Sequence, residues 1–159
     1  MRLLATLALA FAAFFPLNAE VVRPSPDFSW VDSSGATHSS KEFRGRALVV
    51  LIANSPREWA FRSQVGQLQQ VYQRLAAEKV VCVAAFSGQS GLVRSNIPFV
   101  VPPDGASVAG AFQATRGFSM AIIGKDGNLD YFGPKILPAQ RVYDIITNSF
   151  AFQQALRRF

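Results

Sequence analysis

An uninterrupted apolar run at residues 47–53, Ala-Leu-Val-Val-Leu-Ile-Ala, constrains the fold of this chain more than any other feature. Such a run, rich in branched side chains, is typical of a strand that is covered on both faces of a sheet. A helical pattern follows it, because apolar residues recur every three or four positions at Phe61, Val65, Leu68, Tyr72 and Leu75. A doubly covered strand that leads into an amphipathic helix predicts an α/β fold with helices packed on a parallel or mixed sheet.

The junction between this strand and helix predicts an N-terminal helix cap. Ser55 is the predicted N-cap, Pro56 the first helical residue, and Glu58 completes a capping box. Ligands of open α/β sheets bind beyond the carboxyl ends of the strands, and free N–H groups at a helix N-terminus attract anions. The candidate ligand-binding residues here are therefore Asn54, Ser55, Arg57 and Glu58. Capping alone is the alternative explanation for Ser55, Pro56 and Glu58.

Residues 1–19 have the pattern of a secretory signal peptide. Arg2 precedes an apolar run, and small residues near Ala19 form a cleavage site. The apolar run is shorter than the roughly 20 residues that a membrane-spanning helix needs. We expect cleavage after Ala19, no transmembrane segment in the mature protein, and a periplasmic or secreted location. An uncleaved anchor or a buried helix is the alternative explanation for this segment.

Residues 20–159 are enough for one domain with its own core and too few for two ordinary ones. Half of the residues are hydrophobic and 16% are charged, a composition that argues against disorder. The formal net charge of +6 comes from basic residues that are spread along the chain. This spread predicts a solvated surface and no nucleic-acid partner, with docking on anionic envelope polymers or lipid as the alternative.

Cys82 is the single cysteine, so the chain cannot form an internal disulfide. It lies in the apolar run of residues 80–86, which predicts a second strand buried on both faces. A thiol in that setting packs as a small apolar side chain and has a raised pKa. We expect Cys82 to be inert. The alternative is a thiol-dependent oxidoreductase or a one-cysteine peroxidase that uses Cys82.

We expect no metal site and no cofactor. His38 is the single histidine and lies in a serine-rich connection. One histidine cannot hold a metal ion, and a catalytic triad needs a nucleophile as well. We expect His38 to be a surface residue without a partner.

The remaining patterns predict two hairpins and two helices. Residues 26–43 predict an antiparallel hairpin followed by a helical turn. Residues 119–132 predict a second hairpin that turns at Gly-Lys-Asp-Gly. Residues 106–112 predict a short helix, and residues 139–158 predict a single helix that closes the chain.

The order of these elements resembles the thioredoxin-like fold of peroxiredoxins. The motifs that carry the resemblance are Pro26-Asp27-Phe28, Phe43-Arg44-Gly45-Arg46, Asp104-Gly105 and Ile123-Gly124-Lys125-Asp126-Gly127. Residues 46–64 and 122–127 also resemble an uncharacterised peroxiredoxin-like bacterial domain that occurs in animal sushi-repeat and matrix proteins. The resemblance implies a mixed sheet flanked by helices, with an N-terminal hairpin.

The resemblance also implies where redox cysteines would lie. Thioredoxin-like enzymes place them in the first turn of the helix after the core strand, near Glu58 and Phe61 in this chain. The cis-proline of such enzymes corresponds to the region of Phe118, where we expect a trans peptide and an altered groove, since a cis bond without proline costs about 2.5–4 kcal/mol. Phe118 therefore joins the candidate ligand-binding residues. The chain has no cysteine near Glu58 and Phe61 and no proline at Phe118. These two differences from thioredoxin-like enzymes favour a non-catalytic binding or envelope-associated protein of unknown partner.

Overall fold

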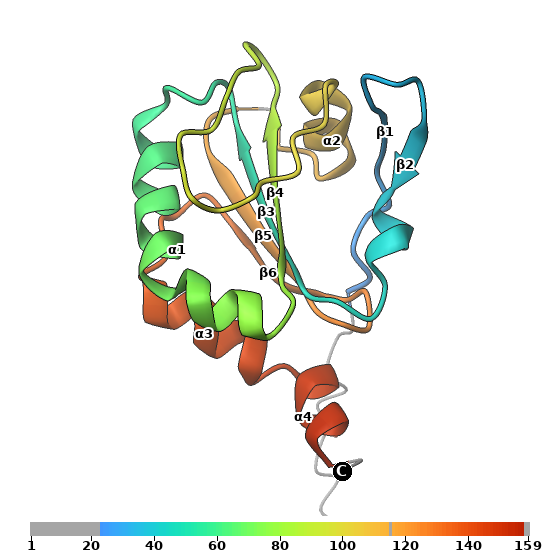
Figure 1. The fold of residues 1–159 in the computed structure, drawn as a ribbon, viewed down its shortest axis with the longest axis vertical. Coiled ribbons are helices and arrows are strands. Elements are labelled where there is room, and N and C mark those ends of the chain that lie inside the picture. Colours follow the sequence, from blue (N-terminus) through green and yellow to red (C-terminus); the bar gives the residue numbers. More distant parts are fainter. Residues whose placement is uncertain (1–22, 115, 158–159) are drawn as a thin grey trace, which may run out of the picture.

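A four-stranded mixed sheet lies at the centre of the computed structural model, which describes residues 23–114 and 116–157 (Figure 1). The predicted signal peptide, residues 1–19, lies outside the described residues. The elements in chain order are β1 (Ser29–Val31), β2 (Thr37–Ser39), the 3₁₀ helix η1 (Ser40–Phe43), β3 (Leu48–Ala53), α1 (Trp59–Ala77), β4 (Val81–Phe86), α2 (Gly105–Ala111), β5 (Ser119–Ile123), β6 (Leu129–Gly133), α3 (Ala139–Thr147) and α4 (Phe150–Leu156).

The strand order in this sheet is β4-β3-β5-β6. β3 pairs in parallel with β4, and α1 makes the crossover that a parallel pair requires. β5 pairs antiparallel with both β3 and β6. Every residue of β3, β4 and β5 is buried, which confirms the strands predicted from the two apolar runs.

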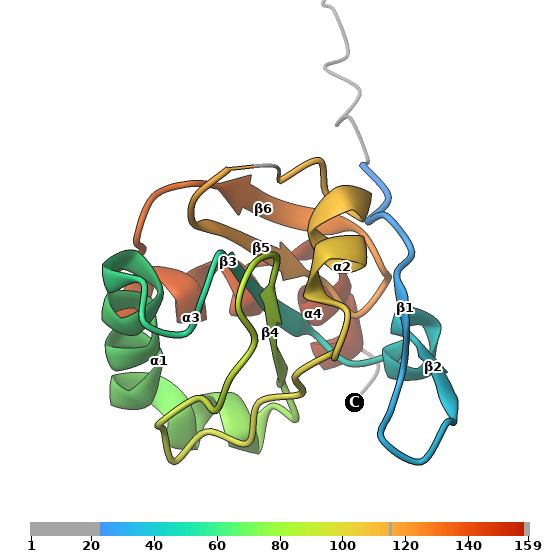
Figure 2. The same ribbon diagram turned by 90° about the horizontal axis from the view of Figure 1, so that it is seen from above.

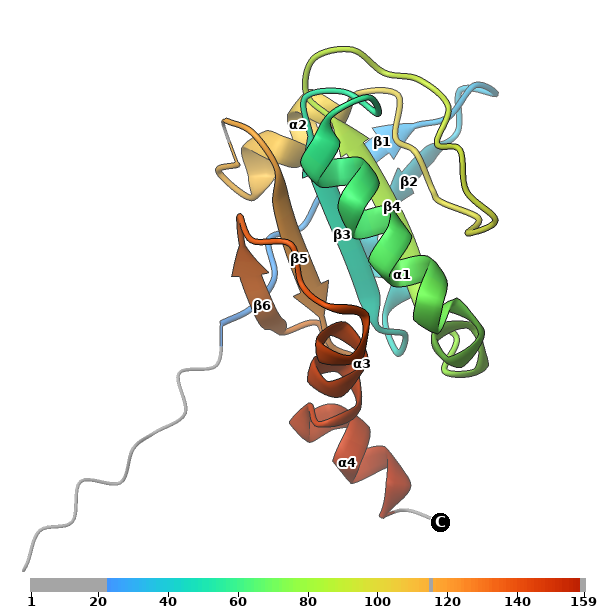
Figure 3. The ribbon, with the colours of Figure 1, turned by 90° about the vertical axis from the view of Figure 1, so that its left-hand side faces the viewer.

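Helices cover both faces of the sheet, as Figure 3 shows with α1 in front of the strands. Seen from above, α1 and α3 lie on one side and α2 with the β1–β2 hairpin on the other (Figure 2). Successive strand residues point to opposite faces, so β3 contributes Val49 and Leu51 to the first layer and Val50 and Ile52 to the second. The continuous apolar run of β3 is therefore explained by two cores that share one strand.

The predicted single helix over residues 139–158 is wrong, because the chain forms two helices there, α3 and α4. Ser149 separates them. Its Oγ donates to the carbonyl oxygen of Ile146 at 3.0 Å and accepts from the N–H of Phe152 at 3.3 Å. A serine that bonds the backbone on both sides ends one helix and caps the next.

His38 has two carboxylate partners, so the prediction of a histidine without a partner is wrong. Its Nε2 lies 2.7 Å from Oδ2 of Asp32, and its Nδ1 lies 3.1 Å from Oε2 of Glu42. The imidazole also stacks on Trp30, with 5.5 Å between ring centroids. The hydrogen bond with Asp32, followed by that with Glu42, raises the pKa of His38 above 6.5. The side chain is one-third exposed, and these contacts hold the β1–β2 hairpin to η1.

We expect an NMR titration of His38, the single histidine, to give a midpoint above 6.5. Because the folded-state pKa is raised, the ion pairs stabilise the hairpin below about pH 6.5 while the carboxylates stay ionised. This contribution is lost as the pH rises through the raised pKa. Asp32→Asn should move the midpoint down, and a wild-type midpoint at or below 6.5 would contradict the observed contacts.

Candidate functional site

The junction after β3 forms a turn instead of the predicted capping box, and α1 begins at Trp59. The N–H of Glu58 donates to the carbonyl oxygen of Ser55 at 3.2 Å, which closes the turn. The Glu58 carboxylate accepts from the N–H of Asn54 at 2.9 Å, so it reaches back to the end of β3. Glu58 is itself the N-cap and makes no side-chain cap bond. The Oγ of Ser55 accepts from the N–H of Arg57 at 3.3 Å, before the helix begins, and so does not cap it.

The loop after β4 is tied to this turn. The carbonyl oxygen of Asn54 accepts from the N–H of Gly88 at 3.0 Å and from that of Gln89 at 2.9 Å. A Cβ at Gly88 would overlap the side chain of Asn54, and one at Gly91 would lie 3.0 Å from Cγ of Pro56. Glycine at these two positions lets the loop approach the turn closely.

Phe118 is not brought to this surface. Its side chain is 5% exposed and belongs to the same core cluster as Phe61. The next residue, Ser119, pairs with Ile52 near the end of β3, so Phe118 lies in the core close to the turn. No peptide bond within the described residues is cis, as expected for the segment at Phe118. Asn54, Ser55, Arg57 and Glu58 therefore gather at the surface, with Phe118 in the core close by.

The two positions at which the resemblance to thioredoxin-like enzymes would place redox cysteines hold no sulfur. Glu58 is bonded to the strand end, and Phe61 is 1% exposed. The Phe61 ring packs edge-on against Phe86 with 5.0 Å between centroids. These two side chains therefore serve the structure of the turn and of the core.

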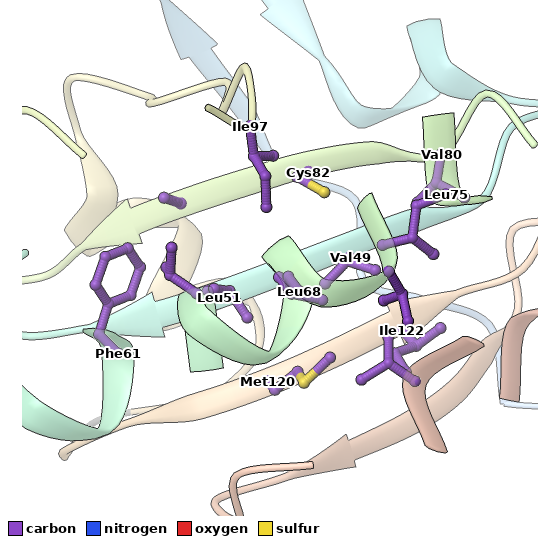
Figure 4. Close-up of a cluster of buried hydrophobic side chains, with 14 of the residues drawn as sticks. Val49, Leu51, Phe61, Leu68, Leu75, Val80, Cys82, Ile97, Met120 and Ile122 are labelled. Carbon is purple, nitrogen blue, oxygen red and sulfur yellow. The ribbon is translucent and has the colours of Figure 1, made fainter. Parts of the chain in front are cut away.

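Cys82 lies on β4, at the edge of the sheet, opposite Val49 of β3 (Figure 4). It belongs to the core cluster between the sheet and α1. The residue is 3% exposed, and burial raises the pKa of the thiol to about 12. A thiolate is the reactive form of cysteine, so a thiol with this pKa is almost entirely unreactive at neutral pH. Its predicted burial is confirmed.

A small hollow of about 200 Å³ next to Cys82 also has Arg46 in its wall. A nearby guanidinium can lower a thiol pKa, but burial is the one cause of the shift at Cys82. Nε of Arg46 instead donates to the carbonyl oxygen of Lys79 at 2.9 Å. The hollow therefore brings Cys82 close to an arginine without activating the thiol.

A larger cavity, here called the arginine pocket, lies between the first half of α1 and the loop after β4. It has a volume of about 670 Å³. Its wall contains Phe61, Val65 and Val93 as apolar residues and Arg57, Arg62 and Arg94 as cations. Of the predicted site residues, Arg57 alone lines this pocket. Sequence reasoning missed Arg62 and Arg94, because no periodic pattern shows that the loop folds back along the helix.

Comparison with known proteins identifies the fold. No family model and no curated protein match the chain. Among solved structures, a thiol:disulfide interchange protein of the thioredoxin family from Chlorobium tepidum TLS is 19% identical, with a TM-score of 0.60 over 82% of this chain and 97% of that chain. The chain has a thioredoxin-like fold.

Two further structures support this assignment at the level of the fold. The exposed lipoprotein thioredoxin of Streptococcus pneumoniae is 18% identical, covers 84% of this chain and 99% of that chain, and has a TM-score of 0.53. The reduced 2-Cys peroxiredoxin of Plasmodium vivax is 11% identical, covers 86% of this chain and 97% of that chain, and has a TM-score of 0.57. The predicted mixed sheet with flanking helices and an N-terminal hairpin is confirmed. None of the described helices has both the length and the apolar character that crossing a membrane requires.

Proposed function

We propose that this chain is an exported thioredoxin-like binding protein without redox activity. The observation that carries the proposal is the placement of sulfur in the fold. The redox positions hold Glu58 and Phe61, and the single thiol, Cys82, is 3% exposed with a pKa of about 12. Dithiol–disulfide exchange needs a second cysteine, and attack on a peroxide needs a thiolate.

Export is proposed from the amino-terminal pattern. Residues 1–19 would be removed as a signal peptide, and residues 20–159 would form the mature domain. A periplasmic or secreted location fits this pattern, and the similar pneumococcal protein is an exposed lipoprotein. The sequence resemblance to the domain of sushi-repeat and matrix proteins agrees with a role outside the cytoplasm. The partner would be a protein or an envelope component, not a nucleic acid.

The binding role is proposed for the surface at the end of β3. Asn54 and Arg57 are exposed there, and Ser55 and Glu58 are partly exposed. Ligands of open α/β sheets approach this end of the strands. With Glu58 and Phe61 in place of redox cysteines, this edge of the fold still presents polar groups to a partner.

The rival function is a thiol enzyme that uses Cys82, in which the hollow lined by Cys82 would have to admit the substrate. The test compares the mature wild-type protein with Cys82→Ser in disulfide reduction and in peroxide turnover, each with an added thiol reductant. We expect both proteins to show the background rate of the reductant alone. Turnover by the wild type that Cys82→Ser abolishes, while its thermal unfolding midpoint is unchanged, would overturn the proposal.

A further inference from the structure

We propose that the arginine pocket binds a small amphipathic carboxylate, in which a carboxylate group is attached to an apolar chain. This inference rests on the proposed binding function and deepens it, since Arg57 belongs to both the turn after β3 and the pocket. The pocket is concave, and its volume of about 670 Å³ is within the roughly 300–1,000 Å³ of small-molecule sites.

The floor of the pocket is apolar and held in the core. Phe61 and Val65 are 1% and 5% exposed and belong to the cluster between α1 and the sheet. Val93 packs against the same cluster from the loop. At the wall, Leu92 is 92% exposed, so its side chain is free to cover an apolar ligand. An apolar chain above this floor would leave water mainly through contact with Leu92, Val93 and Pro56, the more exposed apolar residues of the lining.

The charge of the pocket is entirely positive. Arg57, Arg62 and Arg94 are exposed members of its lining, which contains no aspartate or glutamate. Within the described residues, none of the three guanidinium groups has an ion pair or a side-chain hydrogen bond. Three unpaired like charges around one cavity favour an anion, and arginine binds carboxylate groups in a two-point geometry.

The loop that forms the outer wall is anchored on both sides. At its start, the N–H of Gln89 donates to the carbonyl oxygen of Asn54 at 2.9 Å. Beyond Arg94, Nε2 of Gln69 donates to Oγ of Ser95 at 3.2 Å. These bonds connect the loop to the end of β3 and to α1, so a ligand would not have to order the wall on binding.

The apolar floor and the three arginines together determine which ligand fits the pocket. Inorganic phosphate would meet the arginines and leave the apolar floor unused. An uncharged alcohol with the same chain would use the floor and leave the arginines unpaired. An amphipathic carboxylate uses both.

The test titrates the mature protein with decanoate, decanol and inorganic phosphate, and follows backbone amide NMR shifts. We expect decanoate to shift residues 61–69 and 87–94 and to bind at least about tenfold more tightly than the other two probes. Arg62→Gln combined with Arg94→Gln should weaken decanoate binding by about tenfold or more. The matched control is Arg141→Gln, which removes an exposed arginine from α3 and should leave the affinity unchanged.

Equal affinity for decanoate and decanol would overturn the inference, as would shifts that lie outside the pocket. An unchanged affinity in the double variant would overturn it too, because the arginines would then have no part in binding. These results concern the pocket alone. The proposed absence of redox activity depends on Cys82 and is decided separately by the turnover comparison.

Discussion

Gly105→Ala is expected to destabilise the protein by about 1–3 kcal/mol or more. A Cβ at Gly105, the first residue of α2, would overlap the backbone nitrogen and oxygen of Phe86. Phe86 ends the buried strand β4 and pairs with Ala53 of β3, so its backbone cannot move without disturbing the centre of the sheet. The clash is therefore with backbone atoms rather than with a flexible side chain.

Equilibrium unfolding in denaturant measures this effect, and Gly110→Ala is the matched control. Gly110 lies in the same helix, and a Cβ there meets no atom within 4 Å. Alanine in a helix interior is favoured over glycine by about 0.5–1 kcal/mol, so Gly110→Ala should be neutral or stabilising. Equal stability changes in the two variants would show that α2 does not approach Phe86 as closely as the structure indicates.

Gln64→Met is expected to cost about 2–4 kcal/mol, because it leaves two backbone groups without their partner. The Gln64 side chain is fully buried on α1. Its Nε2 donates to the carbonyl oxygen of Leu137 at 3.0 Å, and its Oε1 accepts from the N–H of Leu137 at 2.7 Å. The side-chain amide of Gln64 therefore bonds both the C=O and the N–H of Leu137, in the loop before α3. Methionine keeps the chain length and removes both bonds.

The control for this prediction is Gln73→Met, on an exposed position of the same helix. Gln73 makes no side-chain hydrogen bond to any described residue, so this change should be nearly neutral. The free energy of unfolding of both variants is the measurement. A loss below about 0.5 kcal/mol in Gln64→Met would mean that water satisfies Leu137 as well as the glutamine does.

The central strands could be predicted from the sequence because their burial leaves a local signal. A strand covered on both faces is apolar at every position, and β3 and β4 both show such runs. Gln64 shows the limit of this reasoning. Periodicity places Gln64 among the polar residues of an amphipathic helix. Its side chain is nevertheless buried against the backbone of Leu137, which lies 73 residues away in the sequence.

Local cap signals were less informative than strand signals. The sequence Ser-Pro-Arg-Glu suits both a helix start and a turn, and the bond from the N–H of Asn54 to the Glu58 carboxylate selects the turn. The prediction that His38 has no partner failed for a related reason. Its partners Asp32 and Glu42 are six and four residues away, and only the hairpin brings Asp32 close to it.

The candidate site was predicted in part. The rule that ligands bind at the carboxyl ends of strands led to the turn of residues 54–58, whose position follows from the order of the elements. The arginine pocket depends on the path of the loop after β4, and loops carry no periodic signal. Arg57 lines the pocket and was among the predicted residues because it also lies in the turn. Arg94 lies in the loop and was missed.

The rate at which Cys82 reacts with a thiol reagent in the native protein shows whether this thiol is reactive in the folded state. The fold keeps its single thiol in the core, and the start of α1 holds no cysteine. Burial and a pKa of about 12 predict that labelling at pH 7 is slow in the native protein and complete within minutes in denaturant. In partial denaturant, the rate should follow the unfolded fraction. Rapid, stoichiometric labelling of the native protein at pH 7 would contradict the burial of Cys82 and its lack of reactivity in the folded state.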